Sequence, residues 1–409
     1  MVSETRIVVT GLGALSAGAQ SPAELGERAF TGKSPAVWYQ DPGFPSVPAI
    51  AACRIDRELS RDKTLRRAHR MDRAAQLALA AASQAYEAAV LGNGTVAPDR
   101  LGVVVGSSRG PIRKWTETFE SLEKKRVLPS LAADSILACL SGVLSFGLGA
   151  GGPAYVVSAA CTSGAQAIIL AAEQLRSGAA DAMIAGGVDA PLHGPLIAQF
   201  LAAGILDPAE PDAACRPFDR DRRGTLLGEG AAFLILETET SARKRGARIH
   251  AVLSGWGQGS EGRVMAAETV RMETLDRVAG RALVLAGLHE TDIDYLNAHG
   301  TGTKLNDQVE MEWLRRWSER RGNPLPFSST KAVTGHALGA SSALEAVICI
   351  QSLGAQAAPP SARCLTPDPH CPEGLILGGA RKMPLRHVMS NSLGFWGTSA
   401  SLIFSRSPA

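Results

Sequence analysis

Short apolar runs that end in glycine alternate along this chain with longer stretches of helix-forming residues. The apolar runs are TRIVVTGLG (5–13), RLGVVVGSS (100–108) and DAMIAGGVDA (181–190). The helix-forming stretches are MDRAAQLALAAASQAYEAAV (71–90), TSGAQAIILAAEQLRSG (162–178) and MEWLRRWSERRG (311–322). Runs of the first kind are typical of buried strands, and glycine follows two of the predicted helices as a C-cap would. Alternating strands and helices predict an α/β architecture.

One stretch contains no charged residue between Asp134 and Glu173. We therefore expect it to be buried or in a membrane. Its length suits a transmembrane helix, but GLGAGGPAYVV (147–157) interrupts it with four glycines and Pro153. We predict a helix, a turn, a buried strand and a second helix here.

The hydrophobic pattern also repeats weakly. MDRAAQLALA (71–80) and LDRVAGRALV (275–284) share five of ten residues at an offset of 204. In each half this helix precedes an apolar strand, and a helix of small residues follows farther on. This order predicts a duplicated α/β domain with halves at 1–245 and 246–409. The basic stretch SARKRGARIH (241–250) is interpreted as a solvated connection between them.

Composition narrows the function classes. The 409 residues include 42 basic and 39 acidic ones, so the overall charge gives no case for a nucleic-acid partner. The N-terminal sequence has no secretory signature and nothing else indicates a membrane protein, so we expect a cytoplasmic location. The seven cysteines form no CxxC pair or zinc spacing and are expected to be reduced thiols.

Cys161 is a candidate nucleophile. It follows the apolar run AYVVSAA and precedes Thr162, Ser163 and Gly164, which open a predicted helix. The free N–H groups at a helix start stabilise a thiolate and lower the thiol pKa. The alternative is an inert buried cysteine, which is the usual state of a free thiol.

A second candidate lies in YLNAHGTGTKLNDQVE (295–310), where glycines and threonines follow His299. Backbone at Gly300 and Gly302 can approach a ligand closely, and the hydroxyls of Thr301 and Thr303 can bond to it. A histidine in such a loop acts either in catalysis or as a structural hydrogen-bonding residue.

A third candidate, STKAVTGHALGASSALEAV (329–347), places Lys331 and His336 before a small, apolar helix. A lysine buried there needs an acidic partner, for which Asp307 and Glu310 are the candidates. The alternative is an exposed lysine on a loop.

Two large aromatic residues, Phe395 and Trp396, lie between glycines in NSLGFWGTSASLIF (391–404). They form either a mobile gate over a pocket or an aromatic plug on a hairpin. At the other end of the chain, VVTGLGALS suggests a dinucleotide-binding turn. Ser16 replaces its third glycine and no acidic strand end follows, so a nicotinamide cofactor is not expected.

In this order the motifs resemble the elongating β-ketoacyl-acyl-carrier-protein synthases of the thiolase fold. The resemblance runs from RIVVTGLGALS (6–16) through CRPFDRDRRGTLLGEGAAFLILE (215–237) to the Phe395 segment, nearly the whole chain. It implies two βαβαβαββ halves in five αβαβα layers. It also implies a homodimer, or a heterodimer with a related ketosynthase or chain-length subunit.

The resemblance assigns roles to the candidate residues. Cys161 would take the acyl chain from acyl carrier protein as a thioester, and the backbone N–H groups of Cys161 and Phe395 would form the oxyanion hole. His299 and His336 would assist decarboxylation of the malonyl unit. The resemblance further implies that Thr301 and Thr303 bind phosphopantetheine and that Phe395 acts as the gate. It implies that Lys331 orients the histidine loop, with Glu310 as its ion partner, and that Asp307 belongs to the same motif. No metal or dissociable cofactor is implied, because phosphopantetheine arrives on the carrier protein.

The site residues also separate this chain from related classes. Initiating synthases are expected to use Cys, His and Asn, degradative thiolases a second cysteine, and chain-length subunits lack the nucleophile. The gate reads GFWGTS instead of the usual Gly-Phe-Gly-Gly-Thr-Asn, with Trp396 and Ser399 as the departures. We therefore predict a specialised type II polyketide or polyene ketosynthase. Fatty-acid elongation and a non-catalytic partner subunit remain the alternatives.

A basic cluster is a candidate docking site for the acidic carrier protein. It lies in SRDKTLRRAHRMDR (60–73) and consists of Lys63, Arg66, Arg67 and Arg70. Opposite charge would steer the carrier to the enzyme. The alternative is a solvated helix face without a partner.

Overall fold

Two halves with the same strand order make up the main sheet. The computed structural model describes residues 5–59, 70–92, 94–262 and 271–407. The N-terminal half has the order β5-β4-β6-β8-β1 and the C-terminal half β11-β10-β14-β15-β9. Within each half this is the third, second, fourth, fifth and first strand. The strands are β1 (Ile7–Ser16), β4 (Leu101–Gly106), β5 (Ala154–Val157), β6 (Ala182–Asp189) and β8 (Gly230–Thr238), then β9 (Ala251–Gly259), β10 (Tyr295–Asn297), β11 (Phe327–Ser328), β14 (His387–Gly394) and β15 (Thr398–Ser405).

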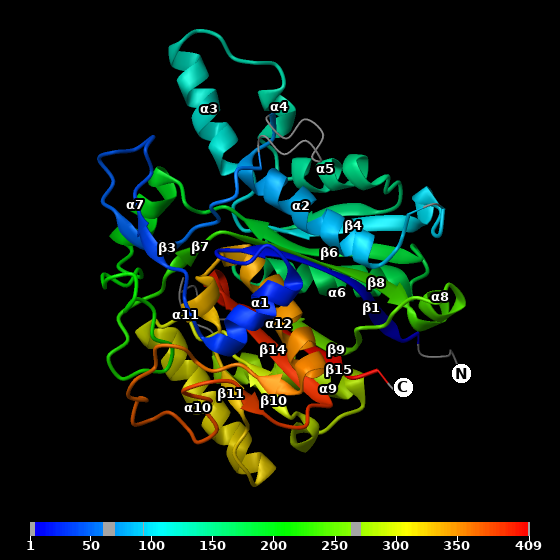
Figure 1. Cartoon of the computed structure of the whole chain (residues 1–409), viewed down its shortest axis with the longest axis vertical. Helices are drawn as coiled ribbons and strands as arrows, with labels where there is room; N and C mark the ends of the chain where they lie inside the picture. The colour runs from blue at the N-terminus through cyan, green and yellow to red at the C-terminus, as the bar shows by residue number, and fades with distance from the viewer. Residues whose placement is uncertain (1–4, 60–69, 93, 263–270, 408–409) are drawn as a thin grey trace.

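Helices cover and separate the two halves of the sheet in five layers (Figure 1). The long helices are α2 (Arg73–Ala88), α5 (Cys139–Leu148), α6 (Ser163–Arg176), α9 (Met272–Ala286), α10 (Lys304–Arg321) and α12 (Ser341–Ala355). Helix α2 packs on β1 and β8, and α5 on β4 and β5. Helices α6 and α12 contact each other in the middle layer, and α9 packs on β9 and β15 with α10 beside it. This αβαβα arrangement confirms the predicted fold.

The shorter elements connect and flank these layers. They are the helices α1 (Pro22–Thr31), α3 (Ile112–Glu123), α4 (Leu131–Asp134), α7 (Gly194–Ala202), α8 (Glu239–Lys244) and α11 (Lys331–Thr334), and the strands β2 (Val37–Tyr39), β3 (Ile50–Cys53), β7 (Leu227–Gly228), β12 (Ala357–Ala358) and β13 (Arg381–Lys382). Single 3-10 turns occur at Pro98–Arg100, Glu290–Asp292, Leu338–Ala340 and Phe395–Gly397.

The internal repeat in the sequence corresponds to equivalent elements in space. The two aligned segments form α2 and α9, which cover the outer faces of the two half-sheets. The two helices of small residues form α6 and α12, which lie together in the core. The halves join through β1 and β9, which pair antiparallel over Ile7–Val9. The predicted boundary at residue 245 falls between β8 and β9, and remains a prediction as a domain limit.

The uncharged segment forms the predicted helix, turn, strand and helix as α5, β5 and α6. The expectation that its strand is buried is wrong. Strand β5 is the last strand of the sheet, and 43% of Tyr155 is exposed on it. Its charge-free sequence therefore marks an uncovered sheet edge in this chain.

A different segment, Leu338–Ala355, has the length and hydropathy of a membrane span, but 83% of it is buried inside the protein. It contains α12, and its apolar character matches its place in the middle layer.

Candidate active site

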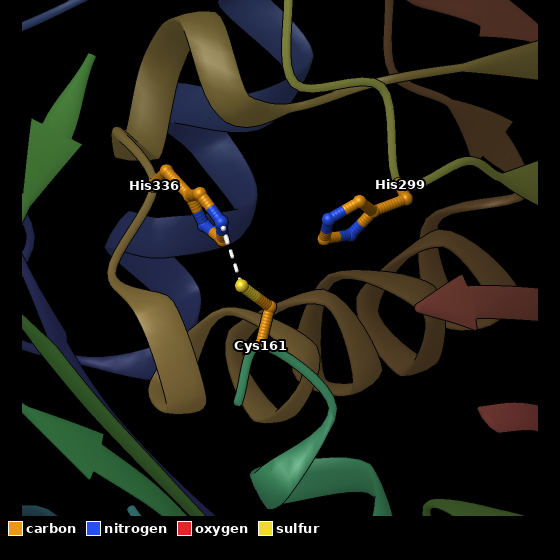
Figure 2. A group of neighbouring side chains, drawn as sticks. All are labelled: Cys161, His299 and His336. Atoms are coloured by element: carbon orange, nitrogen blue, oxygen red, sulfur yellow. Dashed lines mark hydrogen bonds between the residues drawn. The ribbon is translucent and has the colours of Figure 1, made fainter. Parts of the chain in front are cut away.

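Three side chains from separate loops converge in the core (Figure 2). Cys161 lies in the tight turn between β5 and α6, just before the N-cap residue Thr162. Ala160 in this turn has φ 50°, in the left-handed region that side chains other than glycine rarely adopt. His299 follows β10, and His336 follows α11. One ligating atom from each residue lies within 4.8 Å of the others.

His336 is the direct partner of the thiol. Its Nε2 lies 3.1 Å from Cys161 Sγ, and its Nδ1 lies 2.9 Å from the Ser341 hydroxyl at the start of α12. The His299 ring stands edge-on to the His336 ring, with 5.4 Å between centroids. The arrangement aligns a nucleophile with a base, and the second imidazole faces the same space.

Lys331 fixes the second histidine. Its ammonium donates to the backbone carbonyl of His299 at 2.5 Å and lies 3.2 Å from the Nδ1 atom of the same residue. Since an ammonium only donates, Nδ1 accepts and the His299 proton is on Nε2, toward the open side of the ring. Lys331 is completely buried, so the interpretation as a surface lysine is wrong.

Lys331 forms its ion pair with Glu345, whose Oε1 atom lies 2.5 Å from the Lys331 ammonium. The prediction that Glu310 is the ion partner is therefore wrong. Glu345 projects from α12 and is 1% exposed. The carboxylate of Glu310 is occupied elsewhere, because it accepts the backbone N–H groups of His299 and Gly300 at 2.8 and 2.6 Å. Glu310 thus shapes the histidine loop directly.

Asp307, the other partner considered for Lys331, is also bound to backbone. It accepts the N–H of Phe218 at 2.9 Å and that of Gly302 at 3.2 Å. It therefore holds the glycine- and threonine-rich loop in place from the first turn of α10.

The site is uncharged at its centre at rest. Burial raises the pKa of the Cys161 thiol to about 12, although Lys331, Arg109 and the Phe395 N–H act in the opposite direction. The expectation of a lowered thiol pKa is therefore wrong, because removal from water outweighs these stabilising groups. Burial, together with the Lys331 cation, lowers the pKa of both His299 and His336 well below 6.5. Both imidazoles are neutral at physiological pH, so His336 can accept the thiol proton.

The same three side chains could serve as ligands to a metal ion, since imidazole and thiolate both bind zinc. The Lys331 ammonium lies 3.2 Å from His299 Nδ1, however, and opposes a second cation in this space. The donor set therefore fits nucleophilic catalysis better than metal binding.

A cavity of about 580 Å³ opens onto these residues. Thr301 and Thr303 line it, with their hydroxyl oxygens 2.8 Å apart. Phe200, Leu338 and Leu393 provide apolar wall elsewhere. Thus the structure brings the predicted threonines to the same space as Cys161 and both histidines.

The aromatic segment forms the 3-10 turn Phe395–Gly397 between β14 and β15, at the cavity wall. The Trp396 backbone has φ 63°, and 62% of the residue is exposed. An indole this exposed does not plug the hairpin. Ser399, the other departure in this segment, is fully buried in β15.

Of the predicted docking cluster, the structure describes only Arg70. Lys63, Arg66 and Arg67 lie outside the described residues, and Arg70 is exposed just before α2.

Two residues near the site were not predicted. Asp189, at the end of β6, accepts hydrogen bonds from Ser107 Oγ and the backbone N–H groups of Ser108, Arg109 and Gly339 at 2.7–3.0 Å. Burial raises its pKa to about 6. Glu345 is the second. Each is a lone acid in an apolar run, AMIAGGVD and SSALEAVICI, and that is the signal that could have found them.

Comparisons with known proteins agree with this geometry. The model of the β-ketoacyl synthase N-terminal domain matches residues 4–242, and that of the C-terminal domain matches residues 250–364. The 3-oxoacyl-[acyl-carrier-protein] synthase 2 of Staphylococcus aureus strain COL is 33% identical, with 99% of each chain covered. A putative polyketide β-ketoacyl synthase 1 of Streptomyces halstedii is also 33% identical, with 97% of each covered.

Among solved structures, the ishigamide ketosynthase/chain length factor is similar, with a TM-score of 0.88 and 30% identity over 99% of this chain and 100% of that one. The chain belongs to the β-ketoacyl synthase family, and it is an acyltransferase with a Cys-His-His site.

Proposed function

We propose that this enzyme extends a Cys161-bound acyl chain by decarboxylative condensation with a malonyl unit on acyl carrier protein, in a type II polyketide or polyene pathway. The observation that carries the proposal is the 3.1 Å contact between Cys161 Sγ and the neutral imidazole of His336. Its direct test is the detection of an acyl adduct on Cys161.

The first half-reaction loads the enzyme. His336 Nε2 accepts the thiol proton as Cys161 Sγ attacks the carbonyl carbon of the incoming acyl thioester. The carbonyl oxygen becomes an oxyanion, for which the N–H groups of Cys161 and Phe395 are the donors. The bond to the carrier's sulfur then breaks, and the released thiolate takes the proton back from His336. The products are acyl-Cys161 and free carrier thiol.

The second half-reaction forms the carbon–carbon bond. Malonyl thioester loses CO₂, and the bonding electrons form an enolate whose oxygen is stabilised by the Nε2–H group of His299, while the His336 ring faces the same space. The enolate carbon attacks the acyl-Cys161 carbonyl, and the Cys161–acyl bond breaks. The resulting thiolate takes up a proton from water, and the 3-oxoacyl product leaves on the carrier. Lys331 acts as a positioning residue, because it holds His299 through two contacts.

The pathway assignment rests on the gate. Trp396 occupies a backbone conformation that favours glycine, and a bulky side chain there changes the wall of the cavity. The relatives include a 3-oxoacyl-[acyl-carrier-protein] synthase 2 as well as a putative polyketide β-ketoacyl synthase, so fatty-acid elongation remains the alternative.

A non-catalytic partner subunit is the alternative from another class. A subunit that only shapes another enzyme's pocket needs no nucleophile, so the presence of the complete Cys161, His299, His336 and Lys331 arrangement argues against it.

The test incubates the protein with a panel of acyl-carrier-protein thioesters and locates adducts by peptide mass spectrometry. We expect an acyl group on Cys161, lost in Cys161→Ala, and the chains that load will distinguish lipid from polyketide synthesis. Absence of an adduct with every chain, on folded protein and with a related subunit added, would contradict the proposal.

Carrier docking at Lys63, Arg66, Arg67 and Arg70 is part of the proposal. Reversing the charge of Arg66 and Arg67 is expected to raise the apparent KM for carrier-bound substrate, more strongly at low salt. Loading from pantetheine thioesters without a carrier serves as the control and should not change. An unchanged KM for carrier would remove this cluster from the interface.

A further inference from the structure

Arg109 is a cation of the cavity wall that the reaction does not explain. Arg109 lies on the loop after β4 and lines the cavity that Cys161 opens into. Its guanidinium lies over the Phe200 ring, 5.8 Å from the centroid. Among the described residues it has no ion pair or side-chain hydrogen bond, and the cavity lining contains no Asp or Glu. The guanidinium donors therefore face space in which a ligand can supply the acceptor.

The position of Arg109 relates it to the acyl chain rather than to the carrier arm. During condensation, acyl-Cys161 and the malonyl-carrying arm occupy the cavity together. Under the proposed function, Thr301 and Thr303 bind the arm on the loop after β10, in the C-terminal half. The acyl chain must then contact a different part of the cavity wall. Arg109, Phe200 and Leu338 line the same cavity.

The backbone of Arg109 is fixed, which gives the side chain a defined origin. Its N–H donates to Asp189 Oδ1 at 3.0 Å, and the other Asp189 oxygen accepts from Gly339 at 2.7 Å. Asp189 thus ties the Arg109 loop to the segment that leads from His336 into α12.

We propose that Arg109 is a specificity-determining residue that selects acyl chains bearing carbonyl oxygens over saturated or polyene chains of the same length. This inference rests on the proposed function and narrows it toward oxygen-rich polyketide chains. A saturated chain beside the guanidinium removes water from a charged group and returns no hydrogen bond. A chain with an oxo group supplies a charge-assisted acceptor.

The test compares loading of Cys161 from four pantetheine thioesters of equal length: octanoyl, 3-oxooctanoyl, 5-oxooctanoyl and 7-oxooctanoyl. Intact-protein mass spectrometry follows the rate, and the thioesters carry no protein, so carrier docking does not enter. We expect at least one oxo chain to load about tenfold faster than octanoyl, the scale of one hydrogen bond to a charged group.

Three variants separate selection from general binding. Arg109→Met, of similar length and without charge, is expected to bring the oxo/octanoyl ratio to within about twofold, whereas Arg109→Lys should retain part of it. Lys304→Met is the matched control, because Lys304 is also an exposed cation of the lining but begins α10, next to Thr303. It should slow all four chains equally.

An unchanged ratio in Arg109→Met, or faster loading of octanoyl by the wild type, would overturn the inference. No loading of any chain would count against the proposed function instead. Dissociation constants of the same thioesters on Cys161→Ala, which cannot load, then still test the ratio.

Discussion

At the residue scale, the protonation of the two histidines governs the site. Burial and the Lys331 cation lower both pKa values well below 6.5. Since the neutral imidazoles are the active form, decarboxylation of malonyl-pantetheine should keep a constant kcat/KM from pH 8 down to 6.5 and fall only at lower pH. Lys331→Met removes a cation that lowers the His299 pKa, so the acid limb should move up. A wild-type limb centred at or above 6.5 would contradict this prediction.

Lys331 and Glu345 form a buried pair whose removal has separable effects on stability and activity. Lys331→Met alone leaves the Glu345 carboxylate buried without its cation, which costs about 3–5 kcal/mol in the free energy of unfolding. Lys331→Met with Glu345→Met removes both charges and should recover much of that loss. Decarboxylation should stay impaired in both variants, because His299 has lost its positioning contact. Recovery of activity in the double variant would show that Lys331 acts only on stability.

The residue scale also shows how far sequence reasoning extends. Cys161, His299, His336 and Lys331 are recognisable because small residues surround each of them in the chain. The partner of Lys331 is not, although Glu345 is only 14 residues away in sequence, because its carboxylate reaches the ammonium only after α12 folds into the middle layer. The direction of the thiol pKa was likewise missed, since burial is a property of the whole fold.

At the element scale, the turn between β14 and β15 holds Trp396 in a left-handed conformation with φ 63°. Such a conformation costs a residue with a side chain about 1–2 kcal/mol. Trp396→Gly should therefore be more stable to urea than Trp396→Ala by about 1 kcal/mol, although both lack the indole. Both should change the distribution of product chain lengths. An unchanged distribution would exclude a role for the indole in the cavity.

Close packing of α6 against the segment that precedes α12 requires small residues at the contact. A Cβ at Gly164 would lie 2.9 Å from the carbonyl oxygen of Gly339, closer than the backbone permits. Gly164→Ala should destabilise the protein by about 1–3 kcal/mol and slow loading, because the Cys161 turn and the His336 loop would separate. Gly280→Ala in α9 is the control, since no atom of the described residues lies within 4 Å of its Cβ. It should stabilise the protein by about 0.5–1 kcal/mol in urea unfolding. Equal effects of the two substitutions would contradict this account.

At the scale of the whole molecule, the duplicated α/β architecture was predictable because each half repeats the same order of hydrophobic elements. The alignment at an offset of 204 finds α2 and α9, which occupy equivalent places. The strand order could not be obtained in this way, because it depends on pairings between segments far apart, such as β1 with β8 and β9. The exposure of β5 could not be predicted, because a charge-free, apolar strand at the edge of a sheet has the same sequence pattern as a buried strand.

The uncovered edge at β5 predicts an interface with a second subunit. The candidate surface consists of β5, the outer strand of the sheet, and the exposed apolar side chains of α3, the helix that protrudes in Figure 1. Trp115, Phe119 and Leu122 project from α3 at helical spacing and are 53–62% exposed, and Tyr155 is exposed on β5. Exposed apolar patches and uncovered edge strands are places where proteins associate. We expect a second subunit of the same fold to cover this surface, so that the chain purified alone is a dimer by light scattering.

The variant Trp115→Glu with Phe119→Glu tests this surface directly. The two new carboxylates would be buried in the interface and would oppose association, so the measured mass should fall to that of a monomer. Loading of Cys161 is then compared between the dimer and the monomer. Leu365→Glu, at a side chain that is 78% exposed on another loop, is the control and should remain dimeric. A dimer that persists in the double variant would place the interface elsewhere. A wild-type protein that stays monomeric, both alone and with a related ketosynthase subunit, would contradict the prediction of an interface at β5 and α3.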